Sequence, residues 1–255
     1  MVVTTLASGS SGNCTLVSAG DTHVLVDAGI SCRRIAAALG ELGLRLDDLS
    51  GICVTHEHSD HICGLTTLTK KYRIPIYTTG GTGRQLCYRI PFIEDLIYQV
   101  VPGEEFRIED LSVESFSTLH DTVEPCGFAL SDGEKKAAIV TDLGIVTDEV
   151  LDGIQGANLL VVECNHDVEA VKSGPYPYYL KQRILSDHGH LSNEAGAALA
   201  RTAAMDGAHT VILAHLSAEN NTPAMARRAV ETALSGWEGK LLVAPRCERG
   251  QSFQC

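Results

Sequence analysis

Residues 51–65 contain a group of side chains that can bind metal ions. They read GICVTHEHSDHICGL, so an apolar run is followed within six positions by three histidines, two carboxylates and one serine. Imidazole and carboxylate groups are ligands that zinc, manganese and iron accept. We therefore interpret His56, His58, Asp60 and His61 as ligands of two divalent cations, in preference to a polar loop with coincidental histidines.

The spacing of these four residues lets them face a common point. His56 and His58 leave a predicted strand two positions apart, so their side chains point the same way. Ser59 can cap the helix that follows, which places Asp60 and His61 in its first turn, where the helix dipole favours a carboxylate. The two pairs then approach one cleft from two directions, which suits a pair of neighbouring cations.

Three later histidines and one aspartate stand at the ends of predicted elements. His120 follows LSVESFSTL, Asp142 ends AAIVTD, His215 ends VILAH, and His190 precedes a helix. Functional residues gather at strand ends because a rigid sheet holds the loops there. Taken singly, each is better explained as a hydrogen-bonded histidine or a helix cap. Together with residues 56–61 they complete two metal sites, and Asp142 is suited to bridge the ions.

The elements that must position these residues come in two similar series. Strands are predicted at 2–6, 14–17, 24–27, 51–55 and 76–78, with helices at 31–42, 62–72 and 81–88. Strands are then predicted at 111–117, 128–130, 136–141, 159–164, 209–214 and 241–244, with helices at 148–154, 192–205 and 223–234. This order predicts a single α+β domain over residues 1–255, with two sheets packed face to face and helices outside.

Composition narrows the class of protein. The 255 residues are 44% hydrophobic and 20% charged, and no apolar run reaches the length of a membrane span. The first residues lack the pattern of a secretion signal, so we expect a cytoplasmic protein without membrane contact. Nine cysteines without C-x-x-C spacing indicate free thiols rather than disulfides or a thiolate zinc site. The net charge of -12 disfavours non-specific binding of nucleic acid.

The motif THEHSDH, with Asp27 in LVDAG upstream and the later histidines and aspartate, resembles the metallo-β-lactamase fold along essentially the whole chain. The resemblance implies a four-layer αββα sandwich with a binuclear site at the edge of the two sheets. It implies that one ion binds His56, His58 and His120, that the other binds Asp60, His61 and His215, and that Asp142 bridges them. Asp27 matches the supporting aspartate that steadies the metal-binding loop.

Within that superfamily, LASGSSGN, ECNHD, GPYPYYLKQRI, GHLSNEAGA and LAHLSAENNTP resemble the YycJ/WalJ-type exonucleases. This resemblance implies a binuclear phosphodiesterase that degrades DNA 5′→3′ with two zinc or manganese ions, or iron, and a metal-bridging hydroxide as the attacking group. It implies catalytic roles for Asp60 and for His190, which either donates a proton or contacts phosphate, or only caps and orients. His166 is expected to line the cleft or contact a ligand.

Substrate contacts are predicted in two segments. The resemblance suggests that Ser8, Ser10, Ser11 and Asn13 bind a phosphate, although glycine-serine loops are more often plain hairpin turns. In GPYPYYLKQRI, three tyrosines beside Lys181 and Arg183 suit stacking and phosphate contacts with a single-stranded end, and an ordinary loop is nearly as good an explanation.

Two other functions remain open at this point. A hydrolase of small acyl substrates, such as a thioester or a lactone, fits the same fold and is mildly favoured by the acidic surface. A metal-binding module without catalysis is disfavoured because the ligand set is complete. Two divalent ions would offset the acid excess locally, since a nuclease needs one positive cleft rather than a positive surface. No feature of the sequence specifies an oligomeric state.

Overall fold

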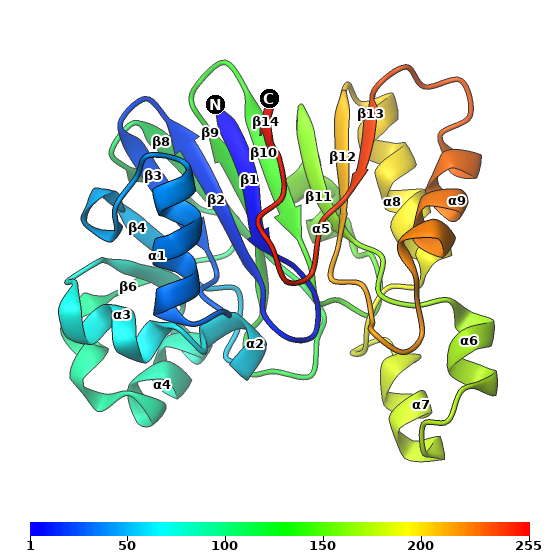
Figure 1. Cartoon of the computed structure of the whole chain (residues 1–255), viewed down its shortest axis with the longest axis horizontal. Coiled ribbons are helices and arrows are strands. Elements are labelled where there is room, and N and C mark those ends of the chain that lie inside the picture. Colours follow the sequence, from blue (N-terminus) through cyan, green and yellow to red (C-terminus); the bar gives the residue numbers. More distant parts are fainter.

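The computed structural model describes residues 1–255 as two mixed seven-stranded sheets packed face to face (Figure 1). The first sheet has the spatial order β14 (Ser252–Gln254), β1 (Val2–Ala7), β2 (Cys14–Ala19), β3 (Thr22–Val26), β4 (Gly51–Cys53), β5 (Ile76–Thr79) and β6 (Ile97–Val100). The second has the order β13 (Lys240–Val243), β12 (Thr210–Ala214), β11 (Leu159–Glu163), β10 (Lys136–Val140), β9 (Cys126–Ser131), β8 (Leu111–Ser117) and β7 (Glu105–Ile108).

Helices cover the outer face of each sheet (Figure 1). The first sheet carries α1 (Cys32–Glu41), α3 (Leu65–Lys71) and α4 (Gly80–Arg89), and the second carries α5 (Asp148–Ile154), α8 (Asn193–Met205) and α9 (Pro223–Ala233). The short helices are α2 (Ser59–Ile62), α6 (Val168–Ser173) and α7 (Tyr178–Ile184), with 3₁₀ turns at Leu46–Asp48 and Pro91–Leu96. In Figure 1, α6 and α7 extend beyond the sandwich below α8 and α9. None of the helices has the length and apolar composition that crossing a bilayer requires.

Three apolar layers hold the sandwich together. The middle layer lies between the sheets and includes Val26 of the first sheet and Phe128 and Ile212 of the second. The other two layers lie between each sheet and its helices, as with Ile35 of α1 and Leu199 of α8. Strands β10, β11 and β12 are buried on both faces, which explains why their sequences are almost entirely apolar.

The predicted αββα sandwich is confirmed, and each series of elements builds one sheet, except that β14 joins the first sheet beside β1. Two local predictions are wrong. The helix predicted at 62–72 begins later, as α3 at Leu65, and Ile62 instead ends α2. Between the two helices stands Gly64, where a Cβ would lie 2.3 Å from the Ile30 carbonyl oxygen. Ser59 is not the cap: it is the first residue of α2, and His58 precedes it without a side-chain cap.

The strand ends that carry the candidate ligands meet at one edge of the sandwich. Parallel pairing joins β3 to β4 in the first sheet and β10, β11 and β12 in the second, so in each sheet the carboxyl ends of these strands lie together. Three residues just beyond them, Asp27, Asp142 and His215, have left-handed backbone, with φ of 63°, 62° and 54°. Such backbone is uncommon for residues other than glycine and is concentrated at functional sites.

Gly29 allows the loops beneath the candidate ligands to approach one another closely. A Cβ at this position would lie 1.6 Å from the Asp60 carbonyl oxygen and 2.6 Å from the Asn13 nitrogen, and these two atoms form a 2.7 Å hydrogen bond. We expect Gly29→Ala to lower the free energy of unfolding by about 3 kcal/mol or more, because neither backbone segment can move without the other.

Chemical denaturation of the wild type and of Gly29→Ala checks this prediction. The matched control is Gly40→Ala in α1, where a Cβ meets nothing within 4 Å. That substitution should raise stability by about 0.5–1 kcal/mol, because alanine is the better helix former. Equal stability of Gly29→Ala and the wild type would contradict the close approach described here.

Candidate metal centre

The structure brings together all seven side chains for which a metal-binding role was predicted. His56, His58 and His120 form one group, and Asp60, His61 and His215 form another; within each group the ligand atoms lie within 4.8 Å of one another. Asp142 belongs with His56 and His61 in a third group and with His215 in a fourth. The carboxylate of Asp142 is therefore near members of both predicted ligand sets, as a bridging role requires.

Four of the histidines are held by hydrogen bonds at their Nδ1 atoms. The Nδ1 of His56 lies 3.0 Å from Thr55 Oγ1, and that of His61 lies 2.7 Å from Asp27 Oδ2. The Nδ1 of His120 lies 2.9 Å from the Gly189 carbonyl oxygen, and that of His215 lies 2.8 Å from Glu163 Oε1. A ring that donates from Nδ1 in its neutral form presents a lone pair at Nε2, which is the form a metal ion binds.

Several atoms of the centre are buried without a hydrogen-bond partner. They are the Nε2 atoms of His56, His120 and His215 and the Oδ2 atom of Asp142. Buried polar atoms are nearly always paired, since leaving them unpaired is costly. Nitrogen and carboxylate oxygen donors that converge in this way fit divalent cations such as zinc, manganese or iron.

The electrostatics of the centre also favour positive charge. Burial alone would lower the pKa of His215, but Asp142, Asp60 and Glu163 raise it to about 10. Burial likewise opposes a charged His61, yet the Asp142 and Asp27 carboxylates hold its pKa well above the ordinary value. Burial would raise the pKa of Asp142, but the surrounding histidines hold it well below the usual range. Bound cations would supply the charge that these carboxylates require and release protons from the rings.

Asp27 lies beneath the metal-binding loop. It is almost fully buried, its Oδ1 accepts a 2.9 Å hydrogen bond from the Thr55 nitrogen, and its Oδ2 pairs with His61 Nδ1. The Thr55 hydroxyl contacts Asp27 and also His56 Nδ1. Two of the candidate ligands are therefore oriented through this one carboxylate, which agrees with the supporting role predicted for it.

Sequence reasoning missed Glu163, which is fully buried at the end of β11. Its Oε1 lies 2.8 Å from the Nδ1 atoms of both His190 and His215, and its Oε2 accepts hydrogen bonds from the Leu143 and Leu191 nitrogens. These partners outweigh burial and lower the pKa of Glu163 to about 2. The available signal was an acidic residue that ends the apolar run LLVVE, just as Asp142 ends another.

The two remaining candidate histidines are in different environments. His190 is about one fifth exposed, with Nδ1 bonded to Glu163 and 3.7 Å from Asp142 Oδ1, so it borders the centre. His166 is almost fully buried, and its Nδ1 has no partner. Its backbone carbonyl accepts a hydrogen bond from the Asn193 nitrogen at the start of α8.

Two of the side chains predicted to contact phosphate form hydrogen bonds within the protein. The Ser8 hydroxyl accepts a 2.7 Å hydrogen bond from the His215 nitrogen, and both residues are buried. The Asn13 side chain accepts from the Gly9 nitrogen, and its Nδ2 lies 3.1 Å from His61 Nε2. Ser10 and Ser11 are exposed at the tip of the same loop.

The two cationic side chains predicted to contact DNA lie in different surroundings. Lys181 donates to the Lys172 carbonyl oxygen of α6. Arg183 donates from Nε to Asp121 Oδ2, and Asp121 Oδ1 lies 3.3 Å from His120 Nε2 and 3.7 Å from His58 Nε2. Of the two, Arg183 therefore lies beside the metal centre, while Lys181 stabilises the contact between α6 and α7.

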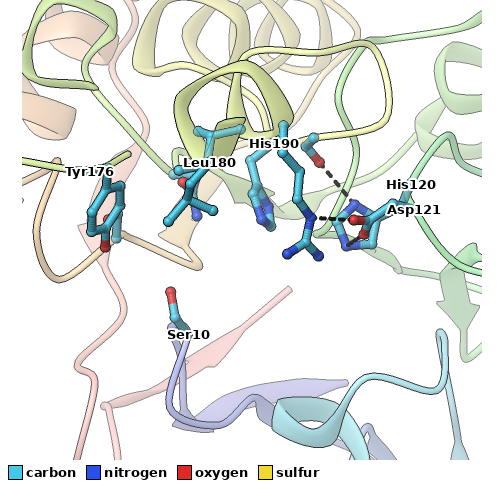
Figure 2. Close-up of a pocket in the computed structure, with 11 residues that line it drawn as sticks. Ser10, His120, Asp121, Tyr176, Leu180 and His190 are labelled. Atoms are coloured by element: carbon cyan, nitrogen blue, oxygen red, sulfur yellow. Dashed lines mark hydrogen bonds and ion pairs between the residues drawn. The ribbon is translucent and has the colours of Figure 1, made fainter. Parts of the chain in front are cut away.

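A pocket of about 160 Å³ opens beside the metal centre. Figure 2 shows His120 and Asp121 at one end, Tyr176 at the other, and His190 and Leu180 between them. Ser10 faces these residues from a separate loop. The other lining residues are Asn165, Arg183, Ile184, Gly189 and Ser217. The segment around α7, expected either as a loop or as a contact surface, thus forms one wall of this pocket.

Comparisons with known proteins agree with this geometry. Residues 22–216 match the family model described as the beta-lactamase superfamily domain. The chain is 42% identical over 232 residues to exodeoxyribonuclease YycJ of Bacillus anthracis, covering 90% of this chain and 87% of that protein. It is 37% identical over 236 residues to exodeoxyribonuclease WalJ of Streptococcus pneumoniae, with the same coverage of 90% and 87%. The crystal structure of Zn²⁺-bound PqqB from Methylobacterium extorquens superposes with a TM-score of 0.74 at 19% identity and covers 100% of both chains.

Proposed function

The chain belongs to the metallo-β-lactamase superfamily and is a metal-dependent hydrolase, and from this premise we propose that it is an exonuclease that degrades DNA 5′→3′. The observation that carries the proposal is the convergence of seven histidine and aspartate side chains, four of which have buried atoms without a partner. The extensive identity with two exodeoxyribonucleases supports DNA as the substrate.

The candidate ligands would be shared between two ions. His56, His58 and His120 would hold one ion, Asp60, His61 and His215 the other, and Asp142 would contact both. Divalent cations here would supply Lewis acidity, which activates water and neutralises charge on phosphate. Asp27 and Glu163 would keep the imidazole rings in the binding orientation through their Nδ1 atoms.

His190 is suited to assist the departure of the leaving oxygen. Its Nδ1 is held by Glu163 Oε1, which leaves Nε2 as the nitrogen that can reach a substrate in the adjoining pocket. A proton held there can pass to the oxygen that leaves the phosphate, which makes His190 a general acid. Asp60, the other residue predicted to be catalytic, would act through the ion it holds, because its carboxylate lies 3.5 Å from His215 Nε2 within the second ligand set.

The acidic surface limits how the protein can bind DNA. With a net charge of -12, favourable contacts must be confined to the cation-loaded centre and its rim. We therefore expect weak binding that falls steeply with salt. The nine free cysteines suit a reducing compartment, and we propose the cytoplasm.

Hydrolysis of a thioester or lactone is less well supported. An acyl chain needs an apolar channel, but of the residues that line the pocket at the centre only Leu180 and Ile184 are aliphatic.

A labelled duplex tests the proposal directly. In the presence of manganese, we expect duplex DNA to shorten progressively from its 5′ ends, because manganese ions bound at the centre would activate water. Excess chelator should abolish the activity, and restoring manganese or zinc should recover it. Intact DNA together with rapid thioester hydrolysis under the same conditions would favour the acyl hydrolase instead.

A further inference from the structure

We propose that the pocket beside the metal centre binds the 5′-terminal nucleoside of the DNA strand, and that it recognises the base and sugar rather than a 5′ phosphate. This inference rests on the proposed function and specifies which part of the substrate this chain selects. The pocket is bounded by α7, the segment before α8, and the loops that carry Ser10 and Ser217.

The position of the pocket fits the end of a strand. His120 and His190 border both the metal centre and the pocket, so a phosphate at the centre has its neighbouring nucleoside in the pocket. Tyr176 closes the far end, opposite His120 (Figure 2). The volume of about 160 Å³ has room for several water molecules, which limits the occupant to about one nucleoside and excludes a longer segment. A pocket of this volume predicts release of mononucleotides.

The lining of the pocket has the two kinds of surface that a nucleoside presents. Tyr176, Leu180 and Ile184 supply aromatic and aliphatic surface that can contact the face of a base. The hydroxyls of Ser10 and Ser217 can form hydrogen bonds with the polar edge of a base or with a sugar. Ser217 Oγ accepts hydrogen bonds from the Glu219 and Asn220 nitrogens, so its hydroxyl proton is left to donate.

The charge of the pocket argues against a site for a 5′ phosphate. Arg183 is the one lysine or arginine among the lining residues, and it is paired with Asp121, which also lines the pocket. His190 is likewise paired with Glu163. A phosphate carrying nearly two negative charges would need cations that are not already compensated. The side chains predicted for phosphate binding add no charge, and two of them, Ser8 and Asn13, are buried in contacts within the protein.

Three substrates separate the alternatives, each a short DNA that differs only at its 5′ end. One has a normal phosphorylated terminal nucleotide, one has a phosphorylated abasic residue at that position, and one has a normal nucleotide with a 5′ hydroxyl. We expect the abasic end to lower kcat/KM by about 5- to 150-fold, the range that loss of one stacked base produces. Loss of the 5′ phosphate should change it by less than about threefold. The reverse ranking would overturn the proposal.

Variants of Tyr176 assign the effect to this pocket. Tyr176→Ala should lower kcat/KM for the substrate with a normal end and leave that for the abasic end little changed. The two kcat/KM values should therefore become similar. Tyr176→Phe should keep the preference, because the ring remains. The matched control is Tyr88→Ala on α4, at a side chain that is 86% exposed and does not line the pocket. A preference unchanged in Tyr176→Ala would place base recognition elsewhere and contradict the assignment.

Equilibrium binding provides a measurement that does not depend on turnover. Saturation-transfer NMR should detect contact between the wild type and deoxyadenosine, reduced in Tyr176→Ala and retained in Tyr88→Ala. Inorganic phosphate should not displace the nucleoside from the pocket. If DNA stays intact but deoxyadenosine binds in this way, the exonuclease proposal fails and the nucleoside site stands. If DNA is degraded without any preference for a base, the exonuclease stands and this inference fails.

Discussion

Replacing Asp142 by alanine is expected to lower the rate of hydrolysis by about 1000-fold or more. Asp142 is almost fully buried. Its carboxylate lies within 4.8 Å of the ligand atoms of His56 and His61 on one side and of His215 on the other. In the proposed arrangement its carboxylate would hold both ions, whose contribution to the reaction would be several kcal/mol. An increase of about 4 kcal/mol in the activation free energy corresponds to that thousandfold decrease.

The same variant should bind fewer than two ions per chain, as measured by elemental analysis after dialysis. The matched control is Asp152→Ala, which removes an exposed carboxylate from α5 and should leave both rate and metal content unchanged. Asp142→Ala that retains two ions and full activity would show that Asp142 does not bridge them. A variant that retains two ions but has no activity would place its role in the reaction rather than in binding.

Replacing Glu163 by alanine should lower both stability and metal affinity. Four groups lose their acceptor: the Nδ1 atoms of His190 and His215, and the Leu143 and Leu191 nitrogens. Removing one partner from a buried charged network costs about 3–5 kcal/mol of unfolding free energy. Because His215 loses the group that fixes its ring, we expect metal affinity to fall by about 10- to 100-fold.

Glu163→Gln separates these two effects. The amide oxygen can accept two of the four hydrogen bonds, but the amide nitrogen cannot accept the other two. Only part of the stability should therefore return, and the lack of charge should keep metal affinity low. Denaturant unfolding and a competitive metal titration measure the two quantities independently. The control is Glu104→Ala at an exposed position, which should change neither. Full metal affinity in Glu163→Ala would mean that His215 is oriented by its other contacts.

The convergence of the candidate metal ligands could be predicted from sequence because their signals are local. His56, His58, Asp60 and His61 follow one another within six positions, and Asp142 and His215 end apolar strands. Strands buried on both faces have an unmistakable apolar composition, so the two sheets could be predicted as well. The fold therefore follows largely from periodicity and from the positions at which the apolar runs stop.

The remaining features depend on contacts between distant segments. Glu163 is separated from His190 by 27 residues and from His215 by 52, so only the folded chain shows that it joins them. The helix is interrupted at Gly64 because its nitrogen donates to the Ala28 carbonyl and the Asp60 carbonyl accepts from the Asn13 nitrogen, both in distant segments. For Ser8 and Asn13 the resemblance suggested phosphate binding, and only the folded chain shows that Ser8 also binds the His215 nitrogen and that Asn13 lies 3.1 Å from His61 Nε2.

The order of the candidate ligands along the chain has a consequence for biosynthesis. The first set ends at His120, whereas the second is incomplete until His215 has been made. At ordinary rates of translation, the roughly 95 residues between them take about 5–20 s to synthesise. A nascent chain therefore carries all three histidines of the first set while the second set still lacks His215.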